Sequence, residues 1–317
     1  MRSDALIEVE NLTKHYGKFK AVEDISFEVG KGDIFGFLGP NGAGKTTTIK
    51  MLTSALSPSS GTARVCGHDL LKESVEIKKH IGLMPELPGF YEDMEAIETL
   101  EFYGEFYKMP SSERRRRAYR LLDLLGLKEF GRWKIKAFSR GMKQKLGFAA
   151  AIMHEPEVLF LDEPTQGLDP NATHQIRELM LDIRNAGATI FLSSHLLWEV
   201  QTICNRVGII HKGELRVVDS IENLQAKTTQ KQSIIAEVGT FPKEARQAIE
   251  QLAGVNAVHY NKTQSKITVE VEKRKKGLSE EINDLLVKSG VRVGSLIAEK
   301  PSLETIYLSY TGGTKSD

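Results

Sequence analysis

Three things are scarce in this sequence: cysteine, net charge and long apolar runs. The 317 residues include two cysteines, Cys66 and Cys204, which cannot build the disulfide framework of a small secreted protein. No apolar run approaches the ~18 residues of a transmembrane helix, so we expect a separate protein to supply any membrane spans. No basic and then apolar leader precedes the first expected strand, and the default prediction is therefore a cytoplasmic location.

The near-zero net charge argues against a nucleic-acid partner. Lysine and arginine together number 43, against 42 for aspartate and glutamate, so nothing in the overall charge draws the chain to nucleic acid or to an anionic membrane. The arginine run at 114–117 is a local exception, but it lies in a polar helical pattern beside Glu113. A solvated helix face explains this run better than a nucleic-acid site does.

The expected strands and helices divide the chain into a large first domain and a small second one. Over residues 1–225 strand and helix patterns alternate, which predicts an α/β fold with a mostly parallel sheet covered on both faces. A strand hairpin near the N-terminus and a helical insertion over about 87–155 interrupt this alternation. A polar stretch at 226–232 is expected to be a linker, and the pattern over 233–317 predicts a small α+β domain of ferredoxin-like order.

A glycine-rich segment at 39–47 is the most informative stretch, because an apolar strand pattern precedes it and a helical pattern follows it. A strand, a glycine-rich turn and a helix N-terminus together present backbone N–H groups and the positive end of the helix dipole to an anion. The spacing is that of the phosphate-binding loop, in which Lys45 reaches the terminal phosphates and Thr46 ligates magnesium. The residues expected to hold the nucleotide here are Gly39, Pro40, Asn41, Gly42, Ala43, Gly44, Lys45, Thr46 and Thr47.

Two acids, Asp162 and Glu163, directly follow the apolar run at 158–161. This order places both carboxylates at the C-terminal end of a buried strand, where open α/β sheets bind their ligands. Asp162 is expected to hold magnesium, usually through water, and Glu163 to face the γ-phosphate and polarise an attacking water. A phosphate loop alone does not distinguish kinases, GTPases and transport ATPases, so the distinction depends on these acids and on the segments around them.

A further segment, 138–142, opens a helix with a hydroxyl at Ser139 and a glycine at Gly141. Alone it is typical of an ordinary helix N-cap. In its order with the phosphate loop and the acids, however, it resembles the signature motif of the nucleotide-binding subunits of ATP-binding cassette (ABC) transporters. The family motif is Leu-Ser-Gly-Gly-Gln and this chain has Phe-Ser-Arg-Gly-Met, so the first glycine and the glutamine are missing. The resemblance covers roughly residues 6–225.

The resemblance implies that each chain carries two half-sites. In the family, the residues matched by Ser139 and Gly141 contact the γ-phosphate of ATP held on the phosphate loop of a second subunit. Hydrolysis then requires a dimer, here most simply a homodimer, with two ATP molecules in its interface. Asp169, in the loop 167–169 that joins the half-sites, is also a candidate helix N-cap.

Four more roles follow from the resemblance. Tyr16 matches the aromatic residue that stacks on adenine, and Val22 is expected to pack beside it. His195 matches the switch histidine that hydrogen-bonds the γ-phosphate. Glu86 stands where the family has a glutamine that touches magnesium and signals to the membrane subunit, and its carboxylate can still coordinate the ion or a water.

The implied function is that of an ATPase subunit that binds ATP and Mg²⁺ and drives a separate polytopic membrane permease. Its expected place is the cytoplasmic face of the cell membrane, as a peripheral protein. The segment 302–308 is similar to the tails of export-type ATPases of the drug, sodium and antibiotic-resistance kind, which favours export. The alternatives are a soluble ATPase of the same family acting on ribosomes or DNA, and a small-molecule kinase.

Overall fold

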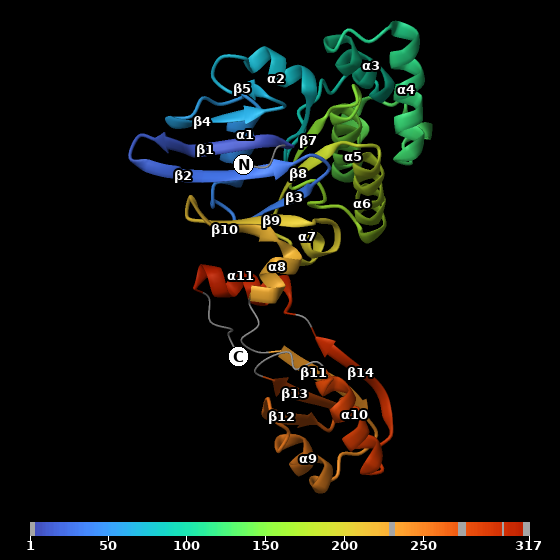
Figure 1. Cartoon of the computed structure of the whole chain (residues 1–317). Helices are drawn as coiled ribbons and strands as arrows, with labels where there is room; N and C mark the ends of the chain where they lie inside the picture. Colours follow the sequence, from blue (N-terminus) through green and yellow to red (C-terminus); the bar gives the residue numbers. More distant parts are fainter. Residues whose placement is uncertain (1–3, 228–231, 272–276, 300, 313–317) are drawn as a thin grey trace. The chain divides into compact units, whose positions relative to one another are not determined.

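The computed structural model describes residues 4–227, 232–271, 277–299 and 301–312, coloured along the sequence in Figure 1. The chain divides into two compact units, Met1–Ile221 and Glu222–Asp317. Among the described helices, none has both the length and the hydropathy that crossing a bilayer requires.

A six-stranded sheet forms the centre of the first unit, with the order β10-β9-β3-β8-β7-β6. Pairing is parallel from β9 through β6, and only the edge strand β10 is antiparallel to its neighbour. The central strands β3, β7 and β8 are buried along their whole length, as expected of a parallel sheet covered on both faces, and the polar residues of β7 and β8 lie at the strand ends. The strands are β3 (Ile34–Leu38), β6 (Ile81–Met84), β7 (Val158–Asp162), β8 (Thr189–Ser194), β9 (Arg206–His211) and β10 (Glu214–Ser220).

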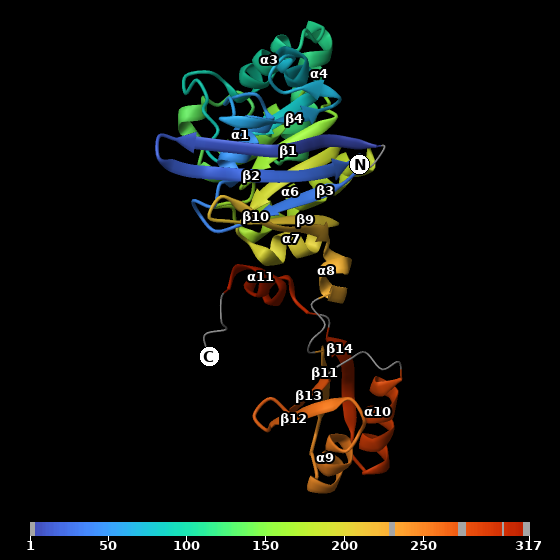
Figure 2. The same ribbon diagram turned by 60° about the vertical axis from the view of Figure 1, so that its left-hand side comes forward.

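Helices cover the two faces of this sheet. Helix α1 (Lys45–Leu52) lies between it and a second, antiparallel sheet, and residues of all three elements share one apolar core (Figures 1 and 2). The longer helices α5 (Arg140–Ala151) and α6 (Pro170–Asn185) lie on the other side. The short helix α7 (Leu197–Ile203) packs so closely on β3 that a Cβ at Gly36 would lie 2.4 Å from Val200.

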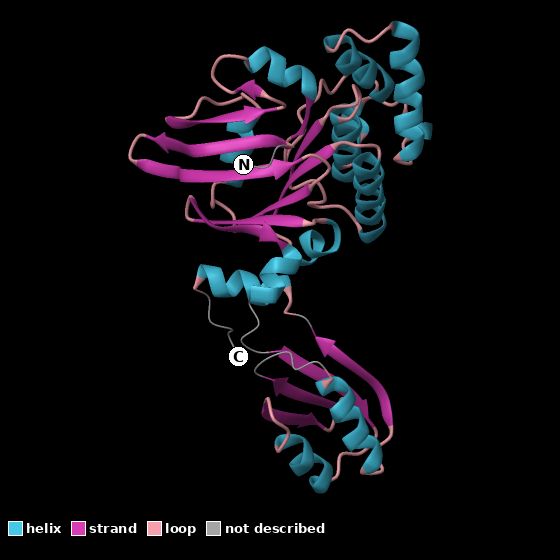
Figure 3. Cartoon of the chain, viewed as in Figure 1, coloured by secondary structure: helices cyan, strands magenta, loops and turns pink. Residues whose placement is uncertain are grey.

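The second sheet of this unit has the order β2-β1-β4-β5 and is antiparallel throughout, as Figure 3 shows in magenta. Stacked and tilted aromatic rings connect this sheet to the central sheet. The ring centroids of Phe27 in β2 and Phe35 in β3, for example, are 5.6 Å apart. The long β1–β2 hairpin is therefore packed on the central sheet through these rings. The strands are β1 (Ala5–Tyr16), β2 (Phe19–Gly30), β4 (Ser60–Val65) and β5 (His68–Asp69).

A helical insertion follows β6, as the sequence predicts. Its helices are α3 (Ala96–Phe106) and α4 (Ser111–Leu124), and a capping box of Glu95 and Glu98 begins the first of them. Short 3₁₀ turns at Lys128–Phe130 and Ile135–Ala137 lead on to α5. The structure adds α2 (Ser74–His80), which with the two-residue β5 was not predicted, because both are too short for a clear periodic pattern.

The second unit contains a four-stranded antiparallel sheet of order β12-β13-β11-β14. Two amphipathic helices pack on it through a core that includes Ile234, Ile249 and Ile282. The order strand, helix, strand, strand, helix, strand confirms the ferredoxin-like prediction. The elements are β11 (Gln232–Val238), α9 (Lys243–Glu250), β12 (Val255–Asn261), β13 (Lys266–Val271), α10 (Leu278–Lys288), β14 (Val293–Glu299) and a last helix, α11 (Leu303–Thr311).

The expected linker at 226–232 needs correction at both ends. Helix α8 (Ile221–Lys227) includes its first two residues, and β11 begins at Gln232. The polar composition hides a helical spacing, because Ile221 and Leu224, three residues apart, are both buried. Residues 228–231 lie outside the described part of the chain.

Candidate functional site

The glycine-rich loop connects β3 to α1, and its conformation depends on the glycines. Gly42 and Gly44 have left-handed φ values of 78° and 109°. At Gly39 a Cβ would lie 2.5 Å from the carbonyl oxygen of Ile210, and at Gly44 one would lie 2.6 Å from that of Ala21. The loop is thus packed closely against neighbouring backbone and ends at the N-terminus of α1, with Gly44 as N-cap.

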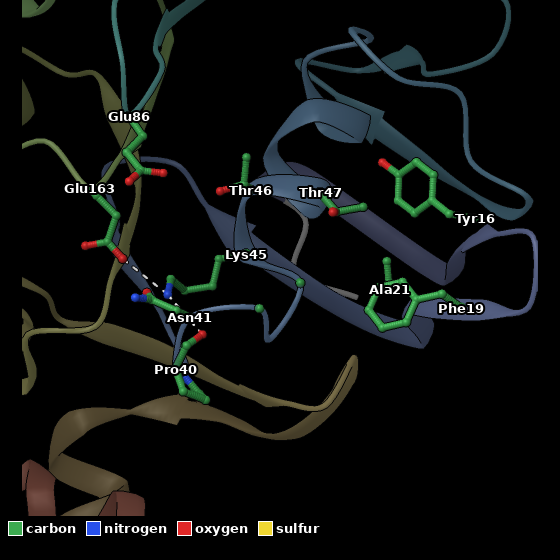
Figure 4. Close-up of a pocket in the computed structure, with 12 residues that line it drawn as sticks. Tyr16, Phe19, Ala21, Pro40, Asn41, Lys45, Thr46, Thr47, Glu86 and Glu163 are labelled. Atoms are coloured by element: carbon green, nitrogen blue, oxygen red, sulfur yellow. Dashed lines mark hydrogen bonds and ion pairs between the residues drawn. The ribbon is translucent and has the colours of Figure 1, made fainter.

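Lys45 is the first residue of α1 and is only 6% exposed. Its ammonium donates to the carbonyl oxygen of Gly39 at 2.7 Å and lies 3.2 Å from Oε1 of Glu163 (Figure 4). A buried cation therefore lies across the loop and faces an equally buried carboxylate. Because isolated buried charges are costly, this pair is the local compensation for both groups.

A cavity of about 330 Å³ extends from this pair to the turn of the β1–β2 hairpin (Figure 4). Its size is at the lower end of the range for small-molecule sites. Aromatic side chains line one end, and the phosphate loop and two carboxylates line the other. The lining residues are Tyr16, Phe19, Ala21, Pro40, Asn41, Gly42, Gly44, Lys45, Thr46, Thr47, Glu86 and Glu163.

The aromatic end differs from the prediction in one respect. Tyr16 lines the cavity and is 49% exposed, but Val22 is fully buried and does not line it, so its expected place beside an adenine ring stays a prediction. Its methyl group lies under the phosphate loop, where a Cβ at Gly44 would lie 3.1 Å from it. Phe19, opposite Tyr16 in the strand register, and Ala21 occupy the cavity wall instead. The sequence could have indicated Phe19, because it is an aromatic residue on the opposite side of the predicted hairpin turn from Tyr16.

The two acids lie at the C-terminal end of β7, as predicted. Asp162 is buried and accepts a hydrogen bond from the hydroxyl of Ser193 at 2.5 Å. Glu163 has a φ of 50°, a left-handed conformation that is uncommon for residues other than glycine. Such backbone strain persists only where the surroundings enforce it, and it clusters at functional sites.

The carboxylate of Glu163 links two cationic or potentially cationic groups. Oε1 pairs with Lys45, and Oε2 lies 2.8 Å from Nδ1 of His195. His195 follows β8, the strand beside β7, so the two strand ends bring these groups together. Lys45, Glu163 and His195 therefore form one connected set, although they come from three separate segments of the chain.

A buried acid that the sequence reasoning missed supports the turn that carries His195. Glu199 of α7 is fully buried, and its Oε2 accepts a hydrogen bond from the hydroxyl of Ser194 at 3.1 Å. That hydroxyl also accepts from the backbone N–H of Leu196 at 3.0 Å. Burial raises the pKa of Glu199, an effect that the bond from Ser194 partly opposes.

Oxygen donors of the kind that bind magnesium come from several separate segments around the phosphate loop. Thr46 and Glu86 both line the cavity, and Asp162 ends the neighbouring strand β7. Glu163 adds a buried Oε1 that accepts no hydrogen bond within the described structure. Hydroxyl and carboxylate oxygens are the ligands that Mg²⁺ prefers, so this donor set fits the ion.

The remaining predicted residues, Ser139, Gly141 and Asp169, do not line this cavity. The Ser139 hydroxyl caps α5 by accepting a hydrogen bond from the backbone N–H of Met142. In the same way, the Asp169 carboxylate caps α6 by accepting a hydrogen bond from the backbone N–H of Ala172. A Cβ at Gly141 would lie 3.5 Å from Leu168, so the start of α5 lies close to the loop that precedes α6.

Two side chains of α5 were not identified from the sequence. Arg140, which replaces a glycine of the signature motif, donates to Oε1 of Gln166 at 3.1 Å and crowds Gly167. Gln144 is buried, and its Nε2 lies 3.4 Å from the carbonyl oxygen of Glu163. Helix α5 is thereby connected both to the loop at 167–169 and to the strained acid.

Comparisons with known proteins agree with this geometry. The family model described as "ABC transporter" matches residues 22–166. The chain is 35% identical to the linearmycin resistance ATP-binding protein LnrL of Bacillus subtilis (strain 168), over 98% of this chain and 100% of that protein. It is 34% identical to the bacitracin transport ATP-binding protein BcrA of Bacillus licheniformis, over 97% and 98% of the respective lengths. A solved ATP-binding subunit of an ABC transporter matches 70% of this chain and 92% of its own, with a TM-score of 0.66 and 32% identity.

Proposed function

The chain belongs to the ABC transporter family as an ATP-hydrolysing subunit, and from this premise we propose how its residues perform hydrolysis and which partners it drives. The observation that carries the proposal is the connected set of Lys45, Glu163 and His195 at the end of a cavity that also contains a phosphate loop. The cavity joins an aromatic surface to the phosphate loop and its Lys45, and ATP has a ring system and a polyphosphate at its two ends.

ATP binds with its adenine ring on Tyr16, and Phe19 adds a second apolar surface. Both rings are substantially exposed at the hairpin turn, so they are available for stacking. The phosphates lie along the loop, where backbone N–H groups and the N-terminus of α1 favour negative charge. Lys45 moves little to reach the terminal phosphates, because its ammonium already lies over the loop.

Hydrolysis is an in-line attack of water on the γ-phosphorus. Glu163 orients and polarises the water by accepting its hydrogen bond, while the bond between the γ-phosphorus and the leaving oxygen of ADP breaks. Lys45 stabilises the negative charge that spreads over the phosphoryl oxygens. His195, whose Nδ1 is 2.8 Å from Glu163, holds the carboxylate and stands at the γ-phosphate end of the site.

The Thr46 hydroxyl and the carboxylates of Asp162 and Glu86 would hold magnesium. When bound, the ion supplies charge neutralisation and Lewis-acid activation of the phosphates. Glu86 brings a negative charge where the family has a neutral amide, so it strengthens the attraction for a cation at this position.

The partner of the reaction is a second copy of the chain. Ser139, Gly141 and Asp169 do not line the cavity of their own chain, and the N-termini of α5 and α6 attract anions. We propose that they close over the ATP of the second copy and that this closure is the motion passed to the membrane subunit.

The membrane subunit docks beside Glu86, and the transport it powers is export. Two exposed apolar side chains, Leu87 and Tyr91, lie in the loop that follows Glu86, and a third, Phe106, ends α3. Phe102 of α3 packs edge-to-face on the rings of both Tyr91 and Phe106. Exposed apolar groups of this size suit a protein interface. Export is inferred from relatives whose names state antibiotic resistance, and it places the chain at the cytoplasmic face of the membrane.

The test is the variant Glu163→Gln in the full-length chain. We expect it to bind ATP with Mg²⁺, to hydrolyse it at least a hundredfold more slowly, and to accumulate as a dimer in size-exclusion chromatography. The control is Glu157→Gln, which changes an exposed acid at the other end of β7 and should hydrolyse ATP normally. Hydrolysis by Glu163→Gln at the wild-type rate would refute the role of this acid, and a wild-type chain without ATPase activity would refute the function.

A further inference from the structure

Ser193 occupies a position that connects the two acids of the site. It lies on β8, directly beside Asp162 of β7 in the parallel register, and its side chain is fully buried. Its hydroxyl donates to Oδ1 of Asp162 at 2.5 Å and accepts from the backbone N–H of Glu163 at 3.2 Å. One hydroxyl therefore contacts the proposed metal ligand and the residue proposed to orient the water.

The bond to Asp162 acts on the orientation of the carboxylate. A hydroxyl has a single hydrogen to donate, and here it goes to Oδ1, which holds the plane of the carboxylate and leaves Oδ2 for the ion or its water. Partners of this kind around metal ligands are worth about 10–100-fold in metal affinity or activity.

The bond from Glu163 acts on a strained backbone. The N–H of Glu163 points between the hydroxyl and the carbonyl oxygen of Ser193, both at 3.2 Å, while the φ of Glu163 is 50°. A left-handed glutamate needs support from its surroundings, and the hydroxyl supplies part of it.

We propose that Ser193 is a positioning residue of the ATPase: its hydroxyl orients Asp162 toward magnesium and holds the backbone that aims Glu163 at the water. The proposal rests on the proposed function of this site. It differs from a merely structural role, because loss of a buried hydrogen bond lowers stability without changing the response to a metal ion.

A matched control lies on the same strand. Thr189 begins β8, is equally buried, and accepts a hydrogen bond from the N–H of Gly32 at 2.8 Å. Thr189→Val removes a buried hydroxyl of the same kind at the end of the strand that is remote from the acids.

The experiment compares Ser193→Ala, Ser193→Thr and Thr189→Val in the full-length chain. Two quantities are measured: the Mg²⁺ concentration for half-maximal ATP hydrolysis, and the affinity for Mn²⁺ in the presence of a non-hydrolysable ATP analogue, by electron paramagnetic resonance. In Ser193→Ala we expect the Mg²⁺ concentration for half-maximal hydrolysis to rise about tenfold and the affinity for Mn²⁺ to fall about tenfold. We expect kcat to fall about tenfold as well, while the KM for ATP at saturating Mg²⁺ stays within about twofold of wild type. Ser193→Thr restores most of the loss, and Thr189→Val lowers Tm with both metal responses unchanged.

Unchanged Mn²⁺ affinity and Mg²⁺ dependence in a folded Ser193→Ala would overturn the proposal, as would an equal metal defect in Thr189→Val. If Ser193→Ala fails to fold, Ser193→Cys keeps the volume with a much weaker donor and is expected to show the same metal defect. If the wild-type chain does not hydrolyse ATP, the proposed function fails. If wild type is active and Ser193→Ala matches it, only the role of Ser193 fails.

Discussion

The two compact units differ in what they bury. Among the residues that the structure describes, the buried charged side chains all belong to the first unit: Asp33, Lys45, Asp162, Glu163 and Glu199. The core of the second unit is apolar, with residues such as Ile249, Ile282 and Leu286 at its centre. Burying a charge lowers stability, so the concentration of buried charges in the first unit indicates that this unit carries the functional site.

The largest effect that this comparison predicts is for Lys45→Ala. Loss of the buried cation removes the group that meets the phosphates and leaves Glu163 without its ion pair, so ATP hydrolysis should fall about a thousandfold. The matched change in the second unit is Lys266→Ala, which removes an exposed lysine 3.7 Å from Glu237. A steady-state ATPase assay should find that control near wild type, and a comparable loss in both would erase the distinction between the units.

The next largest effect is a loss of stability in the second unit, with ATP hydrolysis almost unchanged. Ile282→Ala truncates a fully buried side chain of α10 and should destabilise the second unit by about 2–5 kcal/mol. We expect ATP hydrolysis per folded molecule to stay within about twofold, because the site lies wholly in the first unit. Urea unfolding and an ATPase assay on the same sample give both numbers, and a large loss of hydrolysis in the folded variant would mean that the second unit takes part in the reaction.

The smallest effect is a pH dependence at Glu199. Burial raises the pKa of this acid in the folded state, so the folded chain holds the proton more tightly than the unfolded chain does. The contribution of Glu199 to stability is therefore most favourable below its unfolded pKa and declines as pH rises through its folded pKa.

The substitution Glu199→Gln removes this titratable group, and the glutamine side chain can still accept the hydrogen bond from the hydroxyl of Ser194. Its Tm relative to wild type should thus increase from pH 4.5 to pH 7.5, as followed by thermal denaturation. Glu250→Gln, at an exposed acid paired with Arg246 in the second unit, should show no such trend. A constant Tm difference for Glu199→Gln across this range would contradict the burial argument.

Local motifs made much of the site predictable. The phosphate loop and the two acids could be placed because their chemistry requires a strand end, glycines at set positions and a helix start, all within a few residues of one another. The structure places Lys45 and Glu163, which these motifs predicted, in the lining of one cavity, together with Glu86, which the family resemblance implied. The pairing of two chains through Ser139, Gly141 and Asp169 stays a prediction.

Residues whose role depends on a neighbouring element were not predictable. Val22 and Ala21 are both apolar and adjacent, and only the packing of the hairpin on the phosphate loop decides which of them lines the cavity. Gln144 belongs to a helix whose contact with Glu163 no local pattern indicates.

By itself the sequence determined the order of elements, the phosphate loop and the positions of the acids, because these follow from hydrophobic period, glycine spacing and strand ends. Only the tertiary structure decided the partners of those groups. Strands β7 and β8 are neighbours in the sheet but are separated by α6 along the chain, so the hydrogen bond from Ser193 to Asp162 exists only after folding. Hydrogen bonds and ion pairs act over a few ångströms of space, whatever the distance along the chain.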